Sequence, residues 1–261
     1  MIPALDSSFA PDAAAEAEAR SLLLEHFVAL RYFNPEQAVA DAMAVEGSQR
    51  RLLTLLAAAP GVLGPGRKLL VSGMGSGTEM LAARRYGVHE VHGTEVDPFY
   101  VRLCSLRFRG LSGLQAHHYD GQRTPFEDAA FDALISGHIV EHTADPAAYL
   151  AEQLRVLKPG GAFLLEFPTR YHWKELHTGL LSAEWLPSPL RYAVLRFFGS
   201  RFSPLSPEGK RKCRVILETA LKQVSKGMVL RWLRRSGFAT RVLAITRPDP
   251  GVVKMVLEKV R

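Results

Sequence analysis

The stretch VSGMGSGTEM at residues 71–80 places three glycines two residues apart, at Gly73, Gly75 and Gly77. Glycine has no Cβ, so the chain can turn tightly there and approach a ligand without a steric clash. The apolar run KLLVSG precedes the glycines, and TEMLAARRYG, with helical apolar spacing, follows them. A strand, a glycine loop and a helix in this order predict a nucleotide-type site at a helix N-terminus.

Strands and helices alternate from this loop onward. The apolar patterns predict strands at 68–73, 90–96, 114–119, 130–137 and 162–168, with helices at 78–87, 97–110 and 145–161 between them. Such alternation predicts an α/β fold, a parallel sheet covered by helices on both faces. Two closing strands are expected at 239–247 and 252–260, joined as a hairpin across PDPG.

The remaining segments suggest four parts. Residues 1–62 are an N-terminal helical segment, with one helix at 14–34 and one or two more at 34–61, and 63–168 are the nucleotide-binding core. Residues 169–207 are too apolar for a disordered linker and too irregular for the sheet, so a helical lid over the ligand crevice is expected. Residues 208–261 hold basic amphipathic helices and the closing strands.

Charge is divided unevenly along the chain. Residues 1–169 hold 14 Lys and Arg against 20 Asp and Glu, and residues 170–261 hold 19 against 6, so net charges of −6 and +13 sum to +7. A basic final third suggests that the second ligand is anionic. The N-terminus does not resemble a signal peptide, no apolar run could span a bilayer, and two unrelated cysteines indicate no disulfide framework, so a reduced cytoplasmic location is expected.

Two acids identify the class of nucleotide. The loop lacks the third glycine of the G-x-G-x-x-G dinucleotide pattern and contains no lysine, which argues against a phosphate-rich ligand. Glu95 follows Gly77 by 18 residues, at the end of the second strand, where a carboxylate can accept hydrogen bonds from ribose hydroxyls. Asp120 ends the third strand, where it could accept from an adenine amino group. These features suit a cationic nucleoside.

The glycine loop, Glu95, Asp120-Gly121, FDALISGHIVEHTADP and LRVLKPGG occur in the order and spacing of class I S-adenosylmethionine-dependent methyltransferases. The chain most resembles the type 11 group, over roughly residues 67–168. The resemblance implies a Rossmann-like seven-stranded mixed sheet with the last strand antiparallel. It also implies S-adenosylmethionine as cofactor, with S-adenosylhomocysteine as product, over the carboxyl ends of strands one to four. The implied cofactor residues are Gly73, Met74, Gly75, Gly77, Glu79, Glu95, Val96, Asp120, Gly121, Ser136 and Gly137.

One position departs from that group. An acid usually stands two residues before the first loop glycine and helps to orient the methionine end of the cofactor, but here Val71 occupies the place. Either Glu79, early in the following helix, replaces that acid, or backbone carbonyls hold the amino group.

The segment SGHIVEH after the fourth strand offers the first candidates for catalysis. Methyl transfer is an in-line displacement that depends on holding the acceptor in place, and a hydroxyl acceptor also needs a base. His138 comes first and is the candidate base; the alternative is a helix N-terminal histidine that hydrogen-bonds the cofactor or the backbone. His142 is a further candidate, although Glu141 and His142 more simply brace the loop.

The expected lid offers a second set in YHWKELHTG at 171–179. Glu175 and His177 could bind a polyhydroxylated acceptor or act as the base; the alternative is that this segment only packs as a lid. The pattern E-x-H-T-G resembles lids of methyltransferases associated with bacterial glycan assembly.

Two adjacent histidines and a set of basic residues are further candidates for binding sites. His117 and His118 with Asp120 suggest a metal site, but adjacent strand residues point to opposite faces, so no metal is expected. The basic residues around Lys210–Arg214 and Arg231–Arg235 fit a solvated helix face, an anionic or lipid-linked glycan at a membrane surface, or RNA, in that order of preference.

These observations predict a methyltransferase that transfers a methyl group to a hydroxyl of a carbohydrate or glycoconjugate. The alternatives are a small-molecule natural-product O- or N-methyltransferase, an RNA methyltransferase, and a cofactor-binding module without turnover. The sequence leaves the acceptor atom and the oligomeric state open.

Overall fold

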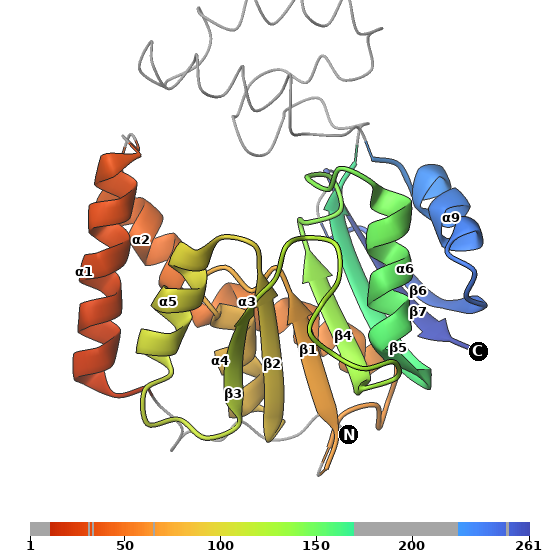
Figure 1. The fold of residues 1–261 in the computed structure, drawn as a ribbon, viewed down its shortest axis with the longest axis horizontal. Helices are drawn as coiled ribbons and strands as arrows, with labels where there is room; N and C mark the ends of the chain where they lie inside the picture. The colour runs from red at the N-terminus through yellow and green to blue at the C-terminus, as the bar shows by residue number, and fades with distance from the viewer. Residues whose placement is uncertain (1–10, 31, 33, 65, 170–223, 249–250) are drawn as a thin grey trace, which may run out of the picture.

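The computed structural model describes residues 11–30, 32, 34–64, 66–169, 224–248 and 251–261. Its centre is a sheet with the strand order β3-β2-β1-β4-β5-β7-β6 (Figure 1). The strands are β1 (Lys68–Ser72), β2 (Glu90–Glu95), β3 (Leu114–His118), β4 (Phe131–Gly137), β5 (Leu157–Pro168), β6 (Thr240–Thr246) and β7 (Val252–Lys259).

The direction of the strands confirms the predicted mixed sheet. β1 to β5 pair in parallel, whereas β7 runs antiparallel to both of its neighbours, β5 and β6. Because β1, β2 and β4 are parallel neighbours, their carboxyl ends meet at one edge of the sheet. In this class of sheet, ligands bind at that edge, where the strand order reverses about β1.

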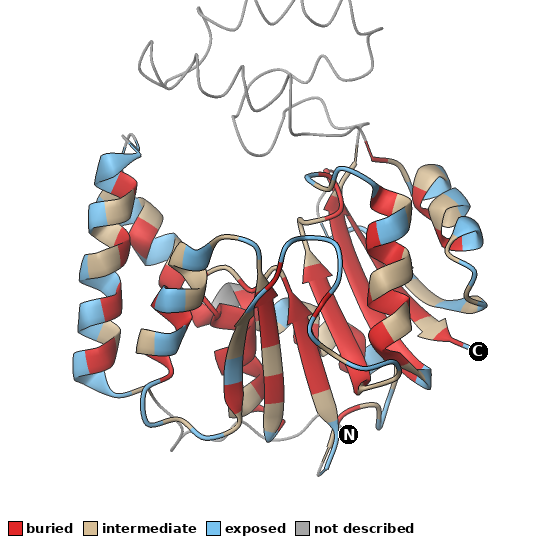
Figure 2. Cartoon of the chain, viewed as in Figure 1, coloured by how far each residue is buried: buried red, intermediate tan, exposed pale blue. Residues whose placement is uncertain are grey.

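Helices cover both faces of the sheet, as predicted. On one face, α3 (Val45–Ala58), α4 (Thr78–Arg85) and α5 (Pro98–Arg107) pack on residues such as Leu69 and Val71. On the other, α6 (Pro146–Val156) and α9 (Lys226–Arg235) pack on residues such as Leu70. Neighbouring residues of β1 thus pack into hydrophobic clusters on opposite faces of the sheet. The central strands are buried along most of their length (Figure 2).

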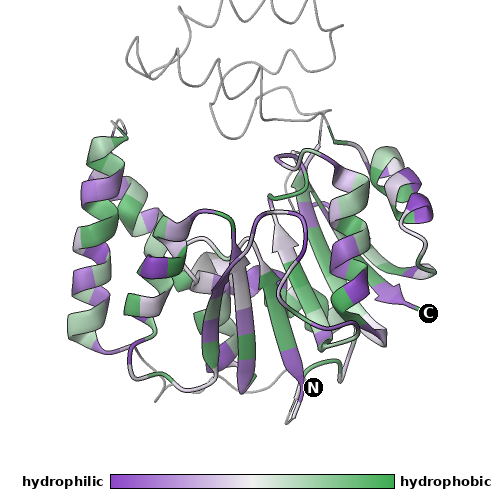
Figure 3. Ribbon diagram, in the orientation of Figure 1, coloured by the Kyte–Doolittle hydropathy of each residue, from purple (hydrophilic) through white to green (hydrophobic). Residues whose placement is uncertain are grey.

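The N-terminal segment forms α1 (Ala13–Ala29) and α2 (Pro35–Met43) before α3. Hydrophobic residues of α1 and α2 form a third cluster with Leu103 of α5, and α1 carries mixed hydrophilic and hydrophobic residues (Figure 3). The predicted helix at 14–34 ends earlier than expected, because Asn34 caps α2 and Pro35 occupies its first turn. The segment 34–61 forms two helices, which meet at the extended residue Ala44.

A buried arginine fixes the N-terminal helices to the core. The Arg107 side chain is fully buried at the end of α5, and its Nε and Nη2 donate to the Glu16 carboxylate of α1 at 2.8 and 2.9 Å. It also donates to the carbonyl oxygens of Ser76, in the glycine loop, and Met43, at the end of α2. One guanidinium therefore joins α1, α2 and the loop.

The helix predicted within 145–161, which Pro159-Gly160-Gly161 was expected to end, stops earlier than predicted. α6 ends at Val156, and Leu157 is already extended and pairs with Phe131 of β4. The pairing then shifts register before Ala162, so residues 158–161 bulge out of the ladder. The bulge is held by one ion pair and one hydrogen bond, since Lys158 Nζ lies 2.8 Å from Asp132 and Lys259 Nζ donates to the Leu157 carbonyl at 2.7 Å.

Much of the predicted lid lies outside the described residues. The structure describes neither residues 170–207 nor the basic segment 208–223, so the predicted lid and the domain boundaries stay predictions. Within 208–261, α9 confirms one of the basic helices, and β6 and β7 confirm the closing strands. None of the described helices has the length and apolar character needed to cross a bilayer.

Replacing Arg107 with methionine is expected to lower the free energy of unfolding by about 3 kcal/mol, because Glu16 and two carbonyls lose a buried donor. The matched control is Arg109→Met. Arg109 is exposed and pairs with exposed Glu18, so less than about 1 kcal/mol is expected there. Urea denaturation of the two variants measures the free energy of unfolding. Equal losses in the two variants would show that the buried Arg107–Glu16 pair stabilises the fold no more than the exposed Arg109–Glu18 pair.

Candidate active site

The glycine loop joins the end of β1 to the start of α4. Gly73 and Met74 donate their N–H groups to the Thr94 carbonyl of β2 at 2.9 and 3.1 Å, which fixes the loop against the neighbouring strand. Gly77 has φ +80°, and a Cβ there would lie 2.4 Å from Phe108, so only glycine fits against α5. Gly75 also has a positive φ, but no atom lies within 4 Å of where its Cβ would stand. The backbone at Gly75 is therefore accessible to a ligand.

Glu95 ends β2 beside this loop, as predicted. Its Oε2 accepts from the Gly75 N–H at 3.2 Å, and its Oε1 accepts from the N–H groups of Val96 and Asp97 at 2.8 and 3.3 Å. The backbone thus holds the carboxylate over the loop. A carboxylate in this position can accept hydrogen bonds from a pair of neighbouring hydroxyls, such as those of a ribose.

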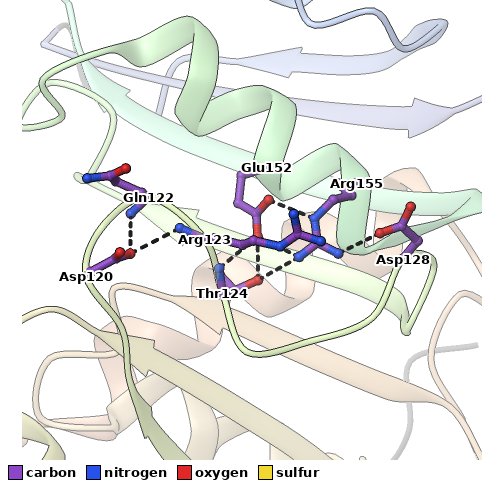
Figure 4. Close-up of polar contacts among 7 residues, drawn as sticks. All are labelled: Asp120, Gln122, Arg123, Thr124, Asp128, Glu152 and Arg155. Atoms are coloured by element: carbon purple, nitrogen blue, oxygen red, sulfur yellow. Dashed lines mark hydrogen bonds and ion pairs between the residues drawn. The ribbon is translucent and has the colours of Figure 1, made fainter.

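The segment after β3 supplies an acid, and Val96, directly after β2, supplies an apolar wall. The exposed Asp120 accepts from the N–H groups of Gln122 and Arg123 at 2.8 and 3.1 Å (Figure 4), and the hydrogen bond from Gln122 is the main reason that its pKa lies below its usual range. Val96 is half exposed, and its Cγ1 lies 3.5 Å from where a Gly121 Cβ would stand. An exposed valine beside an ionised acid suits a flat, polar-edged ring such as adenine.

Two residues of α6 hold this loop in place. Glu152 Oε1 accepts from the N–H and the hydroxyl of Thr124 at 2.8 and 2.7 Å (Figure 4). Arg155 donates to Glu152 and, through Nη1, to Asp128 at 2.7 Å. The loop carrying Asp120 is thus fixed at its far end by charge-assisted hydrogen bonds.

A buried cluster of charges lies at the carboxyl ends of β4 and β5. Glu166 of β5 is at its centre: Oε1 lies 2.6 Å from Arg51 Nη2 and 3.0 Å from His138 Nε2, and Oε2 lies 3.0 Å from Lys254 Nζ of β7. Although burial alone would raise its pKa, these three cations hold the pKa of Glu166 far below its usual range. Glu166 is therefore a carboxylate at any physiological pH.

Arg51 links this cluster to the glycine loop. It comes from α3 and contacts both Glu166 and Glu79, which is buried in the first turn of α4. Its guanidinium lies against Gly137 at the end of β4, where a Cβ would be 2.7 Å from Cζ. Glu79 and Gly137, two predicted cofactor residues, are thus brought together by an arginine of the N-terminal segment.

His138 follows β4 with φ +58°, an uncommon conformation for a residue other than glycine. Burial alone would lower its pKa, but Glu141, whose Oε1 lies 3.4 Å from Nδ1, and Glu166 raise it to about 9. The imidazole therefore carries a proton at neutral pH and is a hydrogen-bond donor in this arrangement. Residues 138–144 form turns, so the alternative that His138 starts a helix is wrong.

Other predicted residues take different positions. The Ser136 hydroxyl lies 2.7 Å from the Tyr149 hydroxyl of α6, and the same tyrosine hydroxyl lies 3.0 Å from the Ser72 hydroxyl. The Ser136 side chain therefore points to the face of the sheet that α6 covers, opposite to the face on which Val71 packs. His142 is exposed in the turn after β4, and its N–H donates to the Ile139 carbonyl. Glu175 and His177 lie outside the described residues.

The two adjacent histidines bind different partners. His117 Nε2 lies 3.0 Å from His92 Nδ1, whereas His118 Nε2 lies 3.1 Å from the Val96 carbonyl oxygen. The predicted alternation of the two side chains is confirmed, and they do not converge on one ion. In the part of the chain that the structure describes, no group of three His, Cys, Asp or Glu could hold a metal.

Three residues of the charge cluster, Arg51, Glu166 and Lys254, are not among those predicted from the sequence. A signal exists for two of them, since Glu166 interrupts the apolar run AFLLEFP and Lys254 interrupts VVKMVLEKV. A charge at a buried strand position needs a partner, but the sequence does not say which. Arg51 carries no comparable signal, because it stands in an ordinary helix.

Comparisons with known proteins agree with this site. Residues 70–165 match the family described as "Methyltransferase domain". A probable S-adenosylmethionine-dependent methyltransferase of Mycolicibacterium smegmatis is 32% identical over 109 residues, 40% of this chain and 39% of that protein. The demethylmenaquinone methyltransferase of Clavibacter sepedonicus is 32% identical over 120 residues, 46% of this chain and 47% of that protein. The matches span less than half the length of these relatives.

Solved structures show the same fold. An S-adenosylmethionine-dependent methyltransferase of Mesorhizobium loti aligns with a TM-score of 0.56 at 19% identity, over 82% of this chain and all of that one. One from Aquifex aeolicus aligns with a TM-score of 0.55 at 15% identity, over 82% and 89% of the two chains. Residues 70–165 therefore form a methyltransferase domain of the class I family, whose cofactor is S-adenosylmethionine.

The residues of the site fit that cofactor. In that fit Glu95 would accept hydrogen bonds from the ribose, Asp120 and Val96 would contact the adenine, and the accessible backbone at Gly75 would allow close approach of the ligand. S-Adenosylmethionine supplies an electrophilic methyl group on a sulfonium, and the described residues around it would bind and orient it.

The pKa of His138 predicts a pH dependence of stability. A histidine whose pKa is raised by folding, here from 6.5 to about 9, stabilises the fold fully below about pH 6.5 and loses this contribution as the pH rises through about 9. The difference in free energy of unfolding between the wild type and His138→Gln should therefore fall by up to about 3 kcal/mol as the pH rises from about 6.5 to above about 9. Urea denaturation at several pH values measures it, and a constant difference between the two proteins would show that His138 is neutral.

Proposed function

We propose that the whole protein is an S-adenosylmethionine-dependent methyltransferase and that its acceptor is a hydroxyl of a carbohydrate or glycoconjugate. One observation supports the methyltransferase activity most directly. The Glu95 carboxylate is held over the glycine loop, with Oε2 3.2 Å from the Gly75 N–H. A carboxylate fixed over a turn with accessible backbone forms a receptor for a nucleoside rather than for a phosphate.

The reaction needs little covalent help from the protein. The acceptor oxygen attacks the methyl carbon as the bond from carbon to sulfur breaks, so the protein contributes mainly by aligning the two reactants. The acceptor proton leaves as the new bond forms. The charged cluster of Arg51, His138, Glu166 and Lys254 stands at the carboxyl ends of β4 and β5 and can orient polar groups of the acceptor.

The base in this proposal is His138 or a residue of the predicted lid. His138 holds its proton at neutral pH, because the glutamates beside it raise its pKa to about 9. Its two ring N–H groups face Glu166 and Glu141, so at neutral pH it positions these carboxylates, and it becomes a base only above that pKa. This favours Glu175 or His177 as the base near neutral pH, and both stay predictions.

The carbohydrate acceptor is supported by the sequence alone. YHWKELHTG resembles lids of glycan-associated methyltransferases, and residues 170–261 carry a net charge of +13, which suits an anionic or lipid-linked glycan. Contact with a membrane surface would follow from a lipid-linked acceptor, and nucleic acid is the less favoured anion. A cytoplasmic location completes the proposal.

A small-molecule acceptor is the second candidate, because of the relatives. They include a ubiquinone biosynthesis O-methyltransferase of Cereibacter sphaeroides, 32% identical over 126 residues, 46% of this chain and 49% of that protein. An acceptor screen that contains sugars, phosphoglycans and quinone-like phenols separates the two candidates. Methyl transfer only to a phenol or an amine would overturn the carbohydrate proposal.

Calorimetric titration with S-adenosylhomocysteine tests the cofactor site. Glu95→Ala is expected to weaken binding by roughly 100-fold, because two ribose hydroxyls lose a charged acceptor worth about 3 kcal/mol. Glu90→Ala is the matched control, since Glu90 begins the same strand at the opposite edge and pairs with Lys68. Unchanged affinity in Glu95→Ala would contradict this placement of the ribose.

Replacing His138 with alanine tests the role of the charged cluster in turnover. The expected result is a fall in kcat of about 10²-fold or more with little change in affinity for S-adenosylhomocysteine. His142→Ala, in the same turn but exposed, is expected to keep normal turnover. Normal turnover in His138→Ala would leave the base, and the orientation of the acceptor, to the predicted lid.

A further inference from the structure

A solvent-facing groove runs between α1 and α5, which lie side by side at the β3 edge of the sheet (Figure 1). The two helices are antiparallel, because Glu18 lies 3.3 Å from Arg109 near one end of the groove and the His26 ring stacks on Phe99 beyond the other. The groove has a volume of about 540 Å³ and is lined by four residues of each helix. None of these lining residues belongs to the candidate active site.

The two walls of the groove have matching sequence patterns. Residues 18–25 of α1 read EARSLLLE, and residues 102–109 of α5 read RLCSLRFR. Each wall therefore has a charge at either end and a serine and a leucine between them, and these are the residues that line the groove. The charges are acidic on α1 and basic on α5, and all four charged residues are exposed. An acidic row thus lies beside a basic row, which makes the face complementary to itself.

We propose that this face, formed by the groove-lining residues of 18–25 and 102–109, binds a second copy of the chain across a two-fold axis parallel to the helices. Such an axis lays α1 of each copy over α5 of the other. Because Glu18 lies beside Arg109 within one chain, each of them then also meets the opposite charge on the second copy. Acids and bases alternate around the axis at both ends of the groove, and such a network stabilises more than isolated exposed pairs do.

The middle of the face is suited to burial. Leu22 and Leu106 are only partly buried in the single chain, and the second copy would cover them. The hydroxyl groups of Ser21 and Ser105 donate to carbonyl oxygens one turn earlier in their own helices, at 3.2 and 2.9 Å. Both hydroxyls keep these hydrogen bonds when water leaves the interface, so no unpaired polar group is buried there. The apolar area is small, and we expect a dimer that dissociates in the micromolar range.

The arrangement of charges selects one of the two symmetric ways to pair this face. An axis across the helices would lay α1 on α1 and α5 on α5. Glu18 would then meet Glu25, and Arg102 would meet Arg109. Like charges that face one another across an interface weaken binding. The axis parallel to the helices brings only opposite charges together and is therefore favoured.

Sedimentation velocity at low ionic strength, where screening is weak, tests this dimer. The wild type is expected to show a reversible monomer–dimer equilibrium. Glu18→Lys with Glu25→Lys makes the face basic throughout, and Arg102→Glu with Arg109→Glu makes it acidic throughout. In each double variant like charges would meet across the axis, so the dissociation constant of the dimer should rise by at least about 10-fold.

Mixing the two double variants should restore a dimer, because the basic face of one then meets the acidic face of the other. Restoration would also show that both variants are folded. Asp41→Lys with Glu127→Lys is the matched control, since it changes the net charge as Glu18→Lys with Glu25→Lys does, at exposed acids outside the groove. The control should dimerise as the wild type does.

Four results would overturn the proposal. A wild type that stays monomeric at high micromolar concentration would show that the face binds no second copy. Dimers that persist in both double variants would place the contact on another surface, and loss of the dimer in the control would make it an effect of net charge. Two monomeric variants that do not combine would exclude the axis parallel to the helices. If a double variant does not fold, Glu25→Lys and Arg102→Glu form the mixing pair, with the same expected results.

Discussion

The chain must reverse from β1 into α4 within the few residues of the glycine loop, and the rest of the site depends on this reversal. Gly73, Gly75 and Gly77 all adopt positive φ values that other residues rarely take. The reversal places the Gly75 N–H beneath Glu95 and lets α4 pack on β2. A side chain at Gly77 would push α5 away, and with it the anchor for the N-terminal helices.

The N-terminal helices are part of the site as well as of the fold. Arg107 joins α1 and α2 to the Ser76 carbonyl in the glycine loop, and Arg51 of α3 reaches the charge cluster around Glu166. Residues far apart in sequence thus hold the glycine loop and the charge cluster in place. The segment that matches the methyltransferase family, residues 70–165, ends just before Glu166 and excludes α3 and β7, so it contains only His138 of the charge cluster.

Sequence patterns predicted the features that depend on local chemistry. Short apolar runs that alternate with helical patterns predicted the strands. The position of Glu95 at the end of a strand correctly predicted that it lies beside the glycine loop. Sequence patterns did not predict the features that depend on contacts between residues far apart in the chain. Arg51 meets Glu166 across 115 residues, which no local spacing reveals. α6 ends at Val156 because Leu157 pairs with β4, although LKPGG resembles an ordinary helix end. The pKa of His138 likewise depends on neighbours from other elements.

The position of β7 has a consequence for how the protein folds as it is synthesised. β7 lies between β5 and β6, so β6 has no partner among the described strands until β7 arrives. The five parallel strands and their helices emerge from the ribosome first, and at that stage one edge, β5, has no second partner among the described strands. An open, apolar edge of this kind is prone to pair with other chains. Closure by the last strand therefore ends the interval in which a newly made chain is most exposed to aggregation.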